Sequence, residues 1–302
     1  MAQCTRYFTL IVIFFVGSLA FAQKASDSII KPIKSKEWIV WTASGTAGLG
    51  SLLALNQLWY ADYPRSAFHW KNDNNEWLQM DKMGHGYAGY QLSSIVAEGF
   101  EAAGATRSKA VWQGALISWT YLAGIELMDG MSSQWGASYG DLIGNTTGAG
   151  LFVVQDQLWH EQRIIPKFSY HTTPYPGLRP QVLGQTVSEQ LIKDYNGQTY
   201  WLSANIKSFI HWKPIPNWLN IAVGYGGRGM ITGDDLLVND VFFPDTQRTR
   251  KFYVSLDVDL TKIKTKNTLL KYVFKAVNLL KIPAPALSFS THGKPEWVGL
   301  YF

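Results

Sequence analysis

Three long segments between residues 81 and 158 constrain the fold of this chain more than any other feature. They contain DKMGHGYAGY, AVWQGALISW and SYGDLIGNTT, and apolar residues recur along each of them at helical spacing. We predict helices over residues 80–104, 110–128 and 138–159, joined by short connections, so that successive helices run antiparallel. The start of the first helix, the end of the second and the start of the third should therefore lie at one end of a bundle.

Polar side chains gather at those three helix ends, and we call the whole set the polar cluster. Its members are Asp81, Lys82, His85, Glu126, Asp129, Ser138, Asp141 and Asn145. Within each helix the members stand one, three or four residues apart, and those three or four apart share a helix face. The sequence thus predicts histidine, lysine, carboxylates and an amide close together in an otherwise apolar bundle.

Two interpretations of the polar cluster stay open. In the first, the cluster is a structural network, because polar groups buried at helix ends must pair with one another. In the second, it is catalytic or binds a divalent metal such as zinc or manganese. The candidate metal ligands are His85, Glu126, Asp129 and Asp141, and the candidate catalytic residues are His85, Lys82, Glu126 and Asp141. Because no H-E-x-x-H motif is present, the residues favour the structural interpretation.

Residues 136–140 (GASYG) match the G-x-S-x-G pattern of a nucleophile elbow. The elbow requires a strand before the serine, whereas a helix and a Gly/Ser turn are predicted here. The pattern Ser138-x-x-Asp141 is also a capping box, so we expect Ser138 to cap the third helix.

The amino terminus is typical of a secretory signal. Arg6 precedes an apolar run over residues 8–20, and residues 20–22 read Ala-Phe-Ala, an A-x-A cleavage site. A retained anchor helix is the alternative, although the run is shorter than the roughly 20 residues of a membrane span. Cys4 is the one cysteine and lies inside this signal. The mature chain should therefore have no disulfide, no thiolate metal site and no lipid-modified cysteine.

Several features indicate a membrane surface as the partner. Residues 38–60 carry no charge and have tryptophan or tyrosine at both ends, which fits either a membrane span or a tightly packed helix. Residues 110–128 are a second candidate for immersion in lipid. The 13 tryptophans suit a membrane–water boundary. The net charge of +5 is thinly spread, with its clearest clustering in the lysines of residues 261–281. An anionic lipid surface is the natural counterpart of this charge; an envelope protein is a further expected partner, and nucleic acid is not.

Beyond Pro166 the helical period gives way to alternation. Prolines near residues 174–180 indicate a linker, and residues 251–263 alternate most clearly, with Phe252, Val254 and Leu256 on one side. Further strands are predicted at 200–210, 218–225, 287–291 and 297–302, and amphipathic helices at 188–195 and 268–281. This half should be an antiparallel sheet with helices on it; a partial outer-membrane barrel is the alternative.

Together these observations predict an α+β fold, with a membrane-associated helical bundle followed by an antiparallel β-rich half. The expected parts are a signal peptide (1–22), a flexible leader (23–36), a helical domain (37–162) and a β-rich domain (163–302). We expect the protein in the cell envelope, on the periplasmic side of a membrane, with the outer membrane favoured.

The segments DKMGHGYAGY, ELMDG and WGASYGDLIGNTTGAGLF resemble the YfiM-like family of predicted periplasmic proteins, and the loop FHWKNDNNEWLQMDKMGH adds to that resemblance. The long second half is similar to envelope proteins of the Bacteroidota. More distantly, D-K-x-x-H followed by S-x-x-D-x-x-x-N-x-x-G resembles the VanZ-like membrane family. The resemblance implies location and architecture and no particular reaction. Several relatives look like lipoproteins, whereas this chain has no cysteine after its cleavage site.

Overall fold

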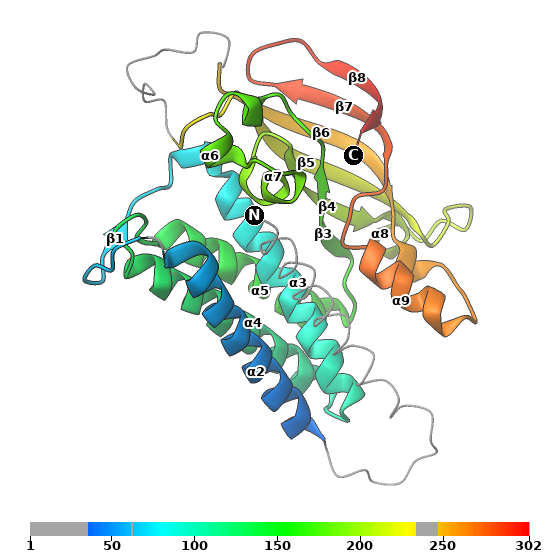
Figure 1. Cartoon of the computed structure of the whole chain (residues 1–302). Helices are drawn as coiled ribbons and strands as arrows, with labels where there is room; N and C mark the ends of the chain where they lie inside the picture. Colours follow the sequence, from blue (N-terminus) through cyan, green and yellow to red (C-terminus); the bar gives the residue numbers. More distant parts are fainter. Residues whose placement is uncertain (1–35, 62, 234–246, 302) are drawn as a thin grey trace. The chain divides into compact units, whose positions relative to one another are not determined.

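The computed structural model describes residues 36–61, 63–233 and 247–301. The predicted signal peptide and all of the leader except Lys36 lie outside the described residues. The fold class is α+β, as predicted, with helices in the N-terminal half and an antiparallel sheet in the C-terminal half (Figure 1). The chain forms two compact units. Unit 1 comprises residues 1–74 and 88–161, and unit 2 comprises residues 75–87 and 162–302.

Unit 1 is a bundle of helices with a short pair of strands. Its elements are α2 (Glu37–Leu55) with its π-helical continuation η2 (Asn56–Tyr60), β1 (Trp70–Lys71), α3 (Met80–Ala102, from Ala88 onward in this unit), α4 (Arg107–Gly130), β2 (Ala137–Ser138) and α5 (Tyr139–Trp159). The three helices predicted from residues 80, 110 and 138 are thus present. Strands β1 and β2 pair in parallel.

Small residues let the helices of unit 1 approach closely. A Cβ atom on Gly114 of α4 would lie 2.5 Å from the carbonyl oxygen of Ser93 in α3. A Cβ atom on Gly89 of α3 would lie 2.7 Å from the carbonyl oxygen of Asn145 in α5. The Ser118 hydroxyl donates to the Gly89 carbonyl at 3.1 Å. Backbone contact through glycine and serine is the packing mode of helices in lipid, where apolar burial gives little driving force.

Helix α2 is the one described helix with the length and composition to cross a membrane, and only 11% of its most apolar 18-residue stretch is buried. It packs on α4, where the Ser51 hydroxyl donates to the Tyr121 hydroxyl at 3.1 Å. Its exposed side chains include Trp38, Leu49 and Leu53. The structure therefore does not bury α2 tightly inside the bundle, which was the alternative to a membrane span.

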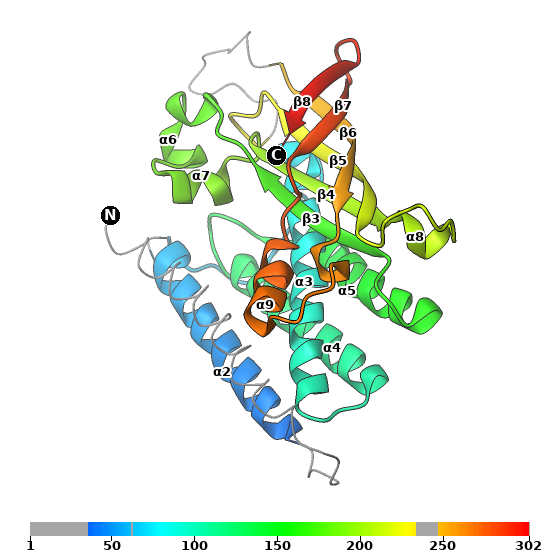
Figure 2. The same cartoon turned by 90° about the vertical axis from the view of Figure 1, so that its right-hand side faces the viewer.

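Unit 2 is built on a six-stranded antiparallel sheet in sequence order, which Figure 2 shows from the side. Its strands are β3 (Ile164–Tyr170), β4 (Gln198–Asn205), β5 (Leu219–Arg228), β6 (Thr249–Val258), β7 (Ala284–Ser290) and β8 (Glu296–Tyr301). The helical segments are η3 (Glu76–Gln79), the first turns of α3, η4 (Tyr175–Gly177), α6 (Pro180–Leu183), α7 (Val187–Lys193), α8 (Ile206–Phe209), η5 (Leu260–Lys262) and α9 (Thr268–Val277).

The sheet curls around one of its faces, which we call the inner face. The hydroxyls of Thr199 in β4 and Tyr301 in β8 are 2.8 Å apart, although three strands separate β4 from β8. Because neighbouring strands are about 4.8 Å apart, a flat sheet would hold those strands roughly 19 Å from each other. The inner face therefore closes on itself around the side chains of Trp201 and Tyr253.

The two faces of the sheet have an inverted polarity. Alternation buries Tyr253, Ser255 and Asp257 of β6 on the inner face. The opposite, outer face exposes a row of apolar residues on four neighbouring strands, each paired with the next: Leu202, Val223, Val254 and Leu287. In a water-soluble sheet the apolar residues would be the buried ones.

Three strands differ most from the sequence predictions. Strand β3, which includes Pro166, was not among the predicted strands; proline is tolerated because β3 is an edge strand. The strand predicted to reach residue 210 ends at Asn205, whose side chain accepts from the Ser208 amide and starts α8. The strand predicted to reach residue 263 ends at Val258, because Asp259 caps the 3-10 turn that follows.

Candidate functional site

The first polar site lies in unit 1 and is centred on Ser138, the N-cap of α5. Its hydroxyl accepts from the Asp141 amide at 3.2 Å and donates to Asp73 Oδ1 at 2.6 Å. The Ser138 amide donates to Glu126 Oε2, at the end of α4, at 3.0 Å. We call Asp73, Glu126, Ser138 and Asp141 the Ser138 group. It joins the end of α4 to the start of α5, as a capping network does.

The Ser138 hydroxyl is unsuited to be a nucleophile. The residue is 1% exposed, and its hydroxyl is shared between a backbone amide and a carboxylate. The local order of strand β2 and helix α5 does match an elbow, but β2 has only two residues. The capping interpretation therefore accounts for Ser138, while Asp73 was missed because it stands 65 residues away in the sequence.

Asp129 and Asn145 occupy separate places in unit 1. Asp129 Oδ1 accepts from the Tyr60 hydroxyl at 2.7 Å, which attaches the end of η2 to the end of α4. Burial, with a smaller contribution from the Asp129 charge, raises the pKa of Tyr60, so this tyrosine stays a donor. Asn145 is fully buried beside Gly89.

The second polar site lies in unit 2, at the start of α3. Asp81 Oδ1 accepts from the Tyr195 hydroxyl at 2.8 Å, and Lys82 Nζ lies 3.3 Å from Asp81 Oδ2. His85 Nε2 is 3.9 Å from Asp81 Oδ1, one helical turn further on. Burial alone would raise the pKa of Asp81, but His85, Lys82 and Tyr195 outweigh it and lower that pKa. We call these four residues the Asp81 group; its carboxylate is ionised at neutral pH.

A left-handed turn sets the start of α3. Trp77, Leu78 and Gln79 have φ angles of 50°, 50° and 61°, which are costly for residues with a Cβ atom. Arg250 donates to the Leu78 carbonyl at 3.2 Å and to Gln79 Oε1 at 2.6 Å. The Tyr225 hydroxyl donates to the same Leu78 carbonyl at 2.5 Å. These bonds from β5 and β6 hold the strained turn that presents Asp81, and no sequence pattern indicates them.

Gly84 makes room for an aromatic side chain beside the Asp81 group. A Cβ atom at this position would lie 2.9 Å from the Tyr200 hydroxyl, which donates to Gln198 Oε1 at 2.9 Å. Burial, and to a smaller extent the charge of Asp81, raises the pKa of Tyr200. Tyr87 packs on the same ring with a centroid distance of 6.0 Å. In unit 2 the group that approaches Gly84 is therefore a side chain, that of Tyr200.

A third polar site, which the sequence did not predict, lies under the inner face of the sheet. Lys167 Nζ is 2.9 Å and Lys281 Nζ 3.9 Å from the Asp257 carboxylate, and all three side chains are fully buried. Ser203 donates to Asp257 Oδ2 at 2.6 Å, and Lys167 also donates to Asn278 Oδ1 at 3.0 Å. We call this arrangement the Asp257 network.

Burial lowers the pKa of Lys281 to about 8, with Lys167 adding to the effect and Asp257 opposing it. The Asp257 network ties the segment after α9 to strands β3 and β6. Its members are enclosed, so it has the character of a structural network.

The eight residues of the predicted polar cluster thus divide between the two units. The Asp81 group holds Asp81, Lys82 and His85, and unit 1 holds the other five. The carboxylates of Asp73, Glu126, Asp129 and Asp81 each accept a hydrogen bond from a protein group. A common metal centre of His85, Glu126, Asp129 and Asp141 stays a prediction.

Comparison with known proteins identifies one match. Residues 69–157 match a family model described as a predicted periplasmic lipoprotein (DUF2279). The match includes the Ser138 group and most of the three predicted helices. No curated protein and no solved structure matches the chain. The match supports an uncharacterised periplasmic family and an exported protein of the cell envelope, as the sequence predicts. The finer resemblances to the YfiM-like and VanZ-like families stay predictions.

Proposed function

We propose that this chain is a non-catalytic protein of the cell envelope that holds to a membrane through apolar surfaces of both units. The observation that carries the proposal is the inverted polarity of the fold. In unit 1 the buried positions of α5 include Asp141, Asn145 and Gln155, while Ile143, Val154 and Leu158 are more than half exposed. A helix in water buries its apolar face and exposes its polar one.

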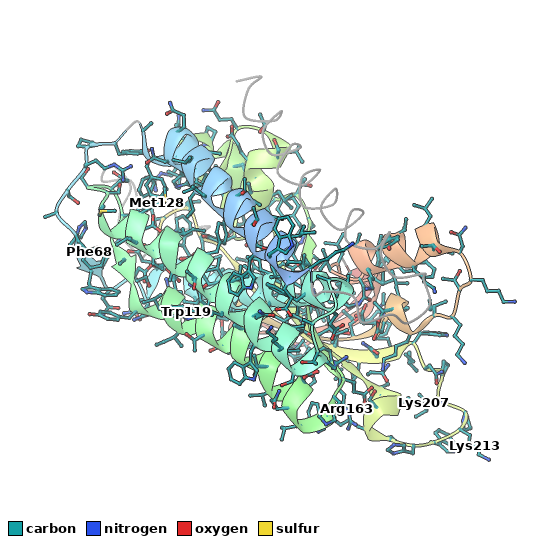
Figure 3. All side chains as sticks on the ribbon, turned by 90° about the horizontal axis from the view of Figure 1, so that it is seen from below. Phe68, Trp119, Met128, Arg163, Lys207 and Lys213 are labelled. Atoms are coloured by element: carbon teal, nitrogen blue, oxygen red, sulfur yellow. The ribbon has the colours of Figure 1, made fainter. Side chains whose placement is uncertain are left out.

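Helix α4 is apolar on its exposed side as well. Ser118 and Glu126 are buried, while Trp112 and Leu116, each 57% exposed, lie one turn apart on the outside. Figure 3 labels Trp119 and Met128 on this helix, and Phe68 in the loop before β1. Exposed apolar residues that continue along a helix face indicate a lipid or protein contact rather than water.

The outer face of the sheet extends this argument to unit 2. Strands β5 and β6 have 10 residues each and alternate apolar residues outward with polar or small residues inward. Strands of this length with this alternation are typical of sheets that contact lipid. The proposal takes lipid as the partner of that face and the outer membrane as the location, with an envelope protein as the other possible partner.

Lipid attachment through a cysteine is not expected to support this association. The relevant family model describes lipoproteins, but the only cysteine is Cys4, inside the predicted signal. The apolar surfaces must therefore supply the membrane affinity.

Membrane fractionation tests the proposal directly. We expect the mature chain to stay with membranes through high-salt and alkaline washing and to be released by detergent. Recovery of the chain in the soluble fraction after either wash would refute the proposal.

Site-specific labelling gives a sharper test, because the mature chain should lack cysteine. Leu116→Cys and Ile143→Cys, labelled with a polarity-sensitive fluorophore, should report an apolar environment in vesicles. Gln134→Cys, an exposed polar position of the same unit, is the matched control and should report water. Equal emission from all three positions would show that unit 1 does not face lipid.

A hydrolase or transferase acting on an envelope lipid or glycan is the second proposal. The Asp81 group favours it, because an ionised carboxylate beside a histidine and a lysine can orient a base or hold a metal. His85 would serve as general base or ligand, Glu126 and Asp141 as ligands or acid/base groups, and Lys82 as the partner of an anionic group. The test is metal analysis of the purified wild type and of the His85→Ala variant. Loss of a metal in the variant with unchanged folding supports this second proposal. A wild type without bound metal refutes its metal-assisted form.

A further inference from the structure

We infer that one end of the sheet in unit 2 binds anionic lipid headgroups, with α9 lying in the membrane interface. This inference rests on the proposed membrane association and names the lipid chemistry that one surface recognises. We call the surface the basic end; it consists of the β4–β5 connection (206–218) and the β6–β7 connection (259–283).

The antiparallel order of the strands brings these two connections to the same end. Asn205, the last residue of β4, pairs with Asn220 near the start of β5, and Leu219 pairs with Val258 at the end of β6. The Asp259 amide donates to the Trp218 carbonyl at 2.8 Å, which joins the two connections. Figure 3 shows Lys213 at the tip of the first connection, with Lys207 and Arg163 closer to the strands.

Exposed charge on this surface has one sign, because Asp259, the one acidic residue of its two connections, is buried. Residues 260–295 contain no aspartate or glutamate, and neither do residues 206–218. The exposed lysines of the basic end are Lys213, Lys264, Lys266, Lys271 and Lys275. A surface with several lysines and no acidic neighbour complements a layer of phosphate groups, and each lysine near such a layer contributes about 1 kcal/mol of attraction, or about fivefold in affinity.

Helix α9 combines these lysines with an unpartnered apolar face. Leu269 is 71% exposed, and Val273 and Val277 follow it at helical spacing with more than a third of their surface exposed. Lys271 and Lys275 stand one turn apart on another side of the helix. An apolar face on one side and lysines on the other is the arrangement of helices that lie in the plane of a membrane interface.

Aromatic residues of the other connection continue the apolar surface. Phe209, Ile210 and Trp212 are all exposed, and Arg163 stacks over the Phe209 ring with its guanidinium 5.6 Å from the ring centroid. Tryptophan and phenylalanine prefer the headgroup level of a bilayer. The combination of apolar, aromatic and cationic side chains fits an anionic lipid surface better than a soluble polyanion, which would leave the apolar residues in water.

The test uses the full mature chain with Leu269→Cys carrying a polarity-sensitive fluorophore. We expect the emission to shift to shorter wavelength with vesicles that contain about one third phosphatidylglycerol, and much less with phosphatidylcholine alone. Adding Lys271→Gln and Lys275→Gln should weaken the apparent affinity about 30-fold, at about fivefold for each lysine. The control for the label is Val187→Cys, an exposed apolar position of α7. The control for the lysine variant is the pair Lys36→Gln and Lys294→Gln, two exposed lysines outside the basic end.

Four results would overturn the inference, and three of them concern the vesicle measurements. These are an unshifted label at position 269, an equal shift with both kinds of vesicle, and an unchanged affinity in the Lys271/Lys275 variant. An equal response to heparin would instead assign the surface to soluble polyanions and would also overturn it. Flotation of the same samples measures total membrane association, so a chain that floats without any shift at position 269 refutes this inference and leaves the proposed function intact.

Discussion

Replacing Asp257 by asparagine tests whether the Asp257 network stabilises unit 2. The carboxylate lies 2.9 Å from Lys167 Nζ and 3.9 Å from Lys281 Nζ, and all three side chains are fully buried. Removing one partner of a buried ion pair typically costs about 3–5 kcal/mol, because the remaining charge is left uncompensated. Asparagine keeps the size and one acceptor oxygen, so the change isolates the charge.

The expected loss lies at the low end of that range. Lys281, whose pKa burial lowers to about 8, can give up its proton near neutral pH at a cost of roughly 1.4 kcal/mol for one pH unit. Lys167 keeps the Val258 carbonyl and the Asn278 amide oxygen as acceptors at 2.7 Å and 3.0 Å. We therefore expect Asp257→Asn to lower the free energy of unfolding of unit 2 by about 3 kcal/mol.

Hydrogen exchange with mass spectrometry is the suitable assay, because the chain has two units and a single unfolding transition is not assured. Opening free energies of peptides from β6 report the change, and peptides from α4 serve as an internal reference. Glu296→Gln is the matched control: it breaks the exposed pair with Lys251, at 3.6 Å, and should cost less than about 1 kcal/mol. Equal effects of the two variants would refute the reasoning. So would a double variant Asp257→Asn/Lys281→Met that is less stable than Asp257→Asn alone.

Three further predictions follow from named contacts. The folded-state pKa of Lys281 lies below its ordinary 10.5, so above pH 8 the unfolded chain binds more protons than the folded chain. The free energy of unfolding should therefore rise between about pH 8 and 9.5. Urea unfolding at several pH values should show this slope in the wild type and not in Lys281→Met. Gly114→Ala should destabilise unit 1 by about 1–3 kcal/mol, because its Cβ atom would lie 2.5 Å from a carbonyl oxygen. The control Gly150→Ala, whose Cβ atom meets nothing within 4 Å, should stabilise unit 1 by about 0.5–1 kcal/mol. Melting temperatures of the two variants that shift in the same direction would contradict this. Ser138→Ala should cost about 1–2 kcal/mol through the lost cap, while Thr147→Ala on the exposed side of α5 should cost much less, and equal losses in melting temperature would count against the capping role.

The helices and most strands could be predicted because their signals are local. Ser138 was recognised as a cap since its partner, the Asp141 amide, is three residues away. The alternation of β6 likewise identified a strand over most of its length. Strand β3 was not predicted; it contains Pro166, which is compatible with a strand only at the edge of a sheet, and the edge position is visible only in the structure.

The polar sites could be predicted only in part, because most of their partners are distant in sequence. Asp73 is 65 residues from Ser138, and Lys167 is 111 residues from Asn278. No spacing rule connects such pairs. The alternation of Phe252 and Tyr253 also could not reveal which side is buried; hydropathy favours burying the apolar side, and the structure exposes it.

The apolar face of α9 is by itself too small to hold the protein on a membrane. Four of its exposed side chains, Leu269, Leu270, Val273 and Val277, would each gain about 1.5–3 kcal/mol on full burial, but each is already between roughly a third and two thirds covered, which leaves about 4 kcal/mol together. A single acyl chain, which binds membranes only marginally, has an association constant of about 10⁴ M⁻¹, or roughly 5–6 kcal/mol. Stable attachment therefore needs the bundle or the outer face of the sheet as well. Removing the apolar residues of α9 should accordingly loosen this helix from the interface while leaving the protein in the membrane fraction.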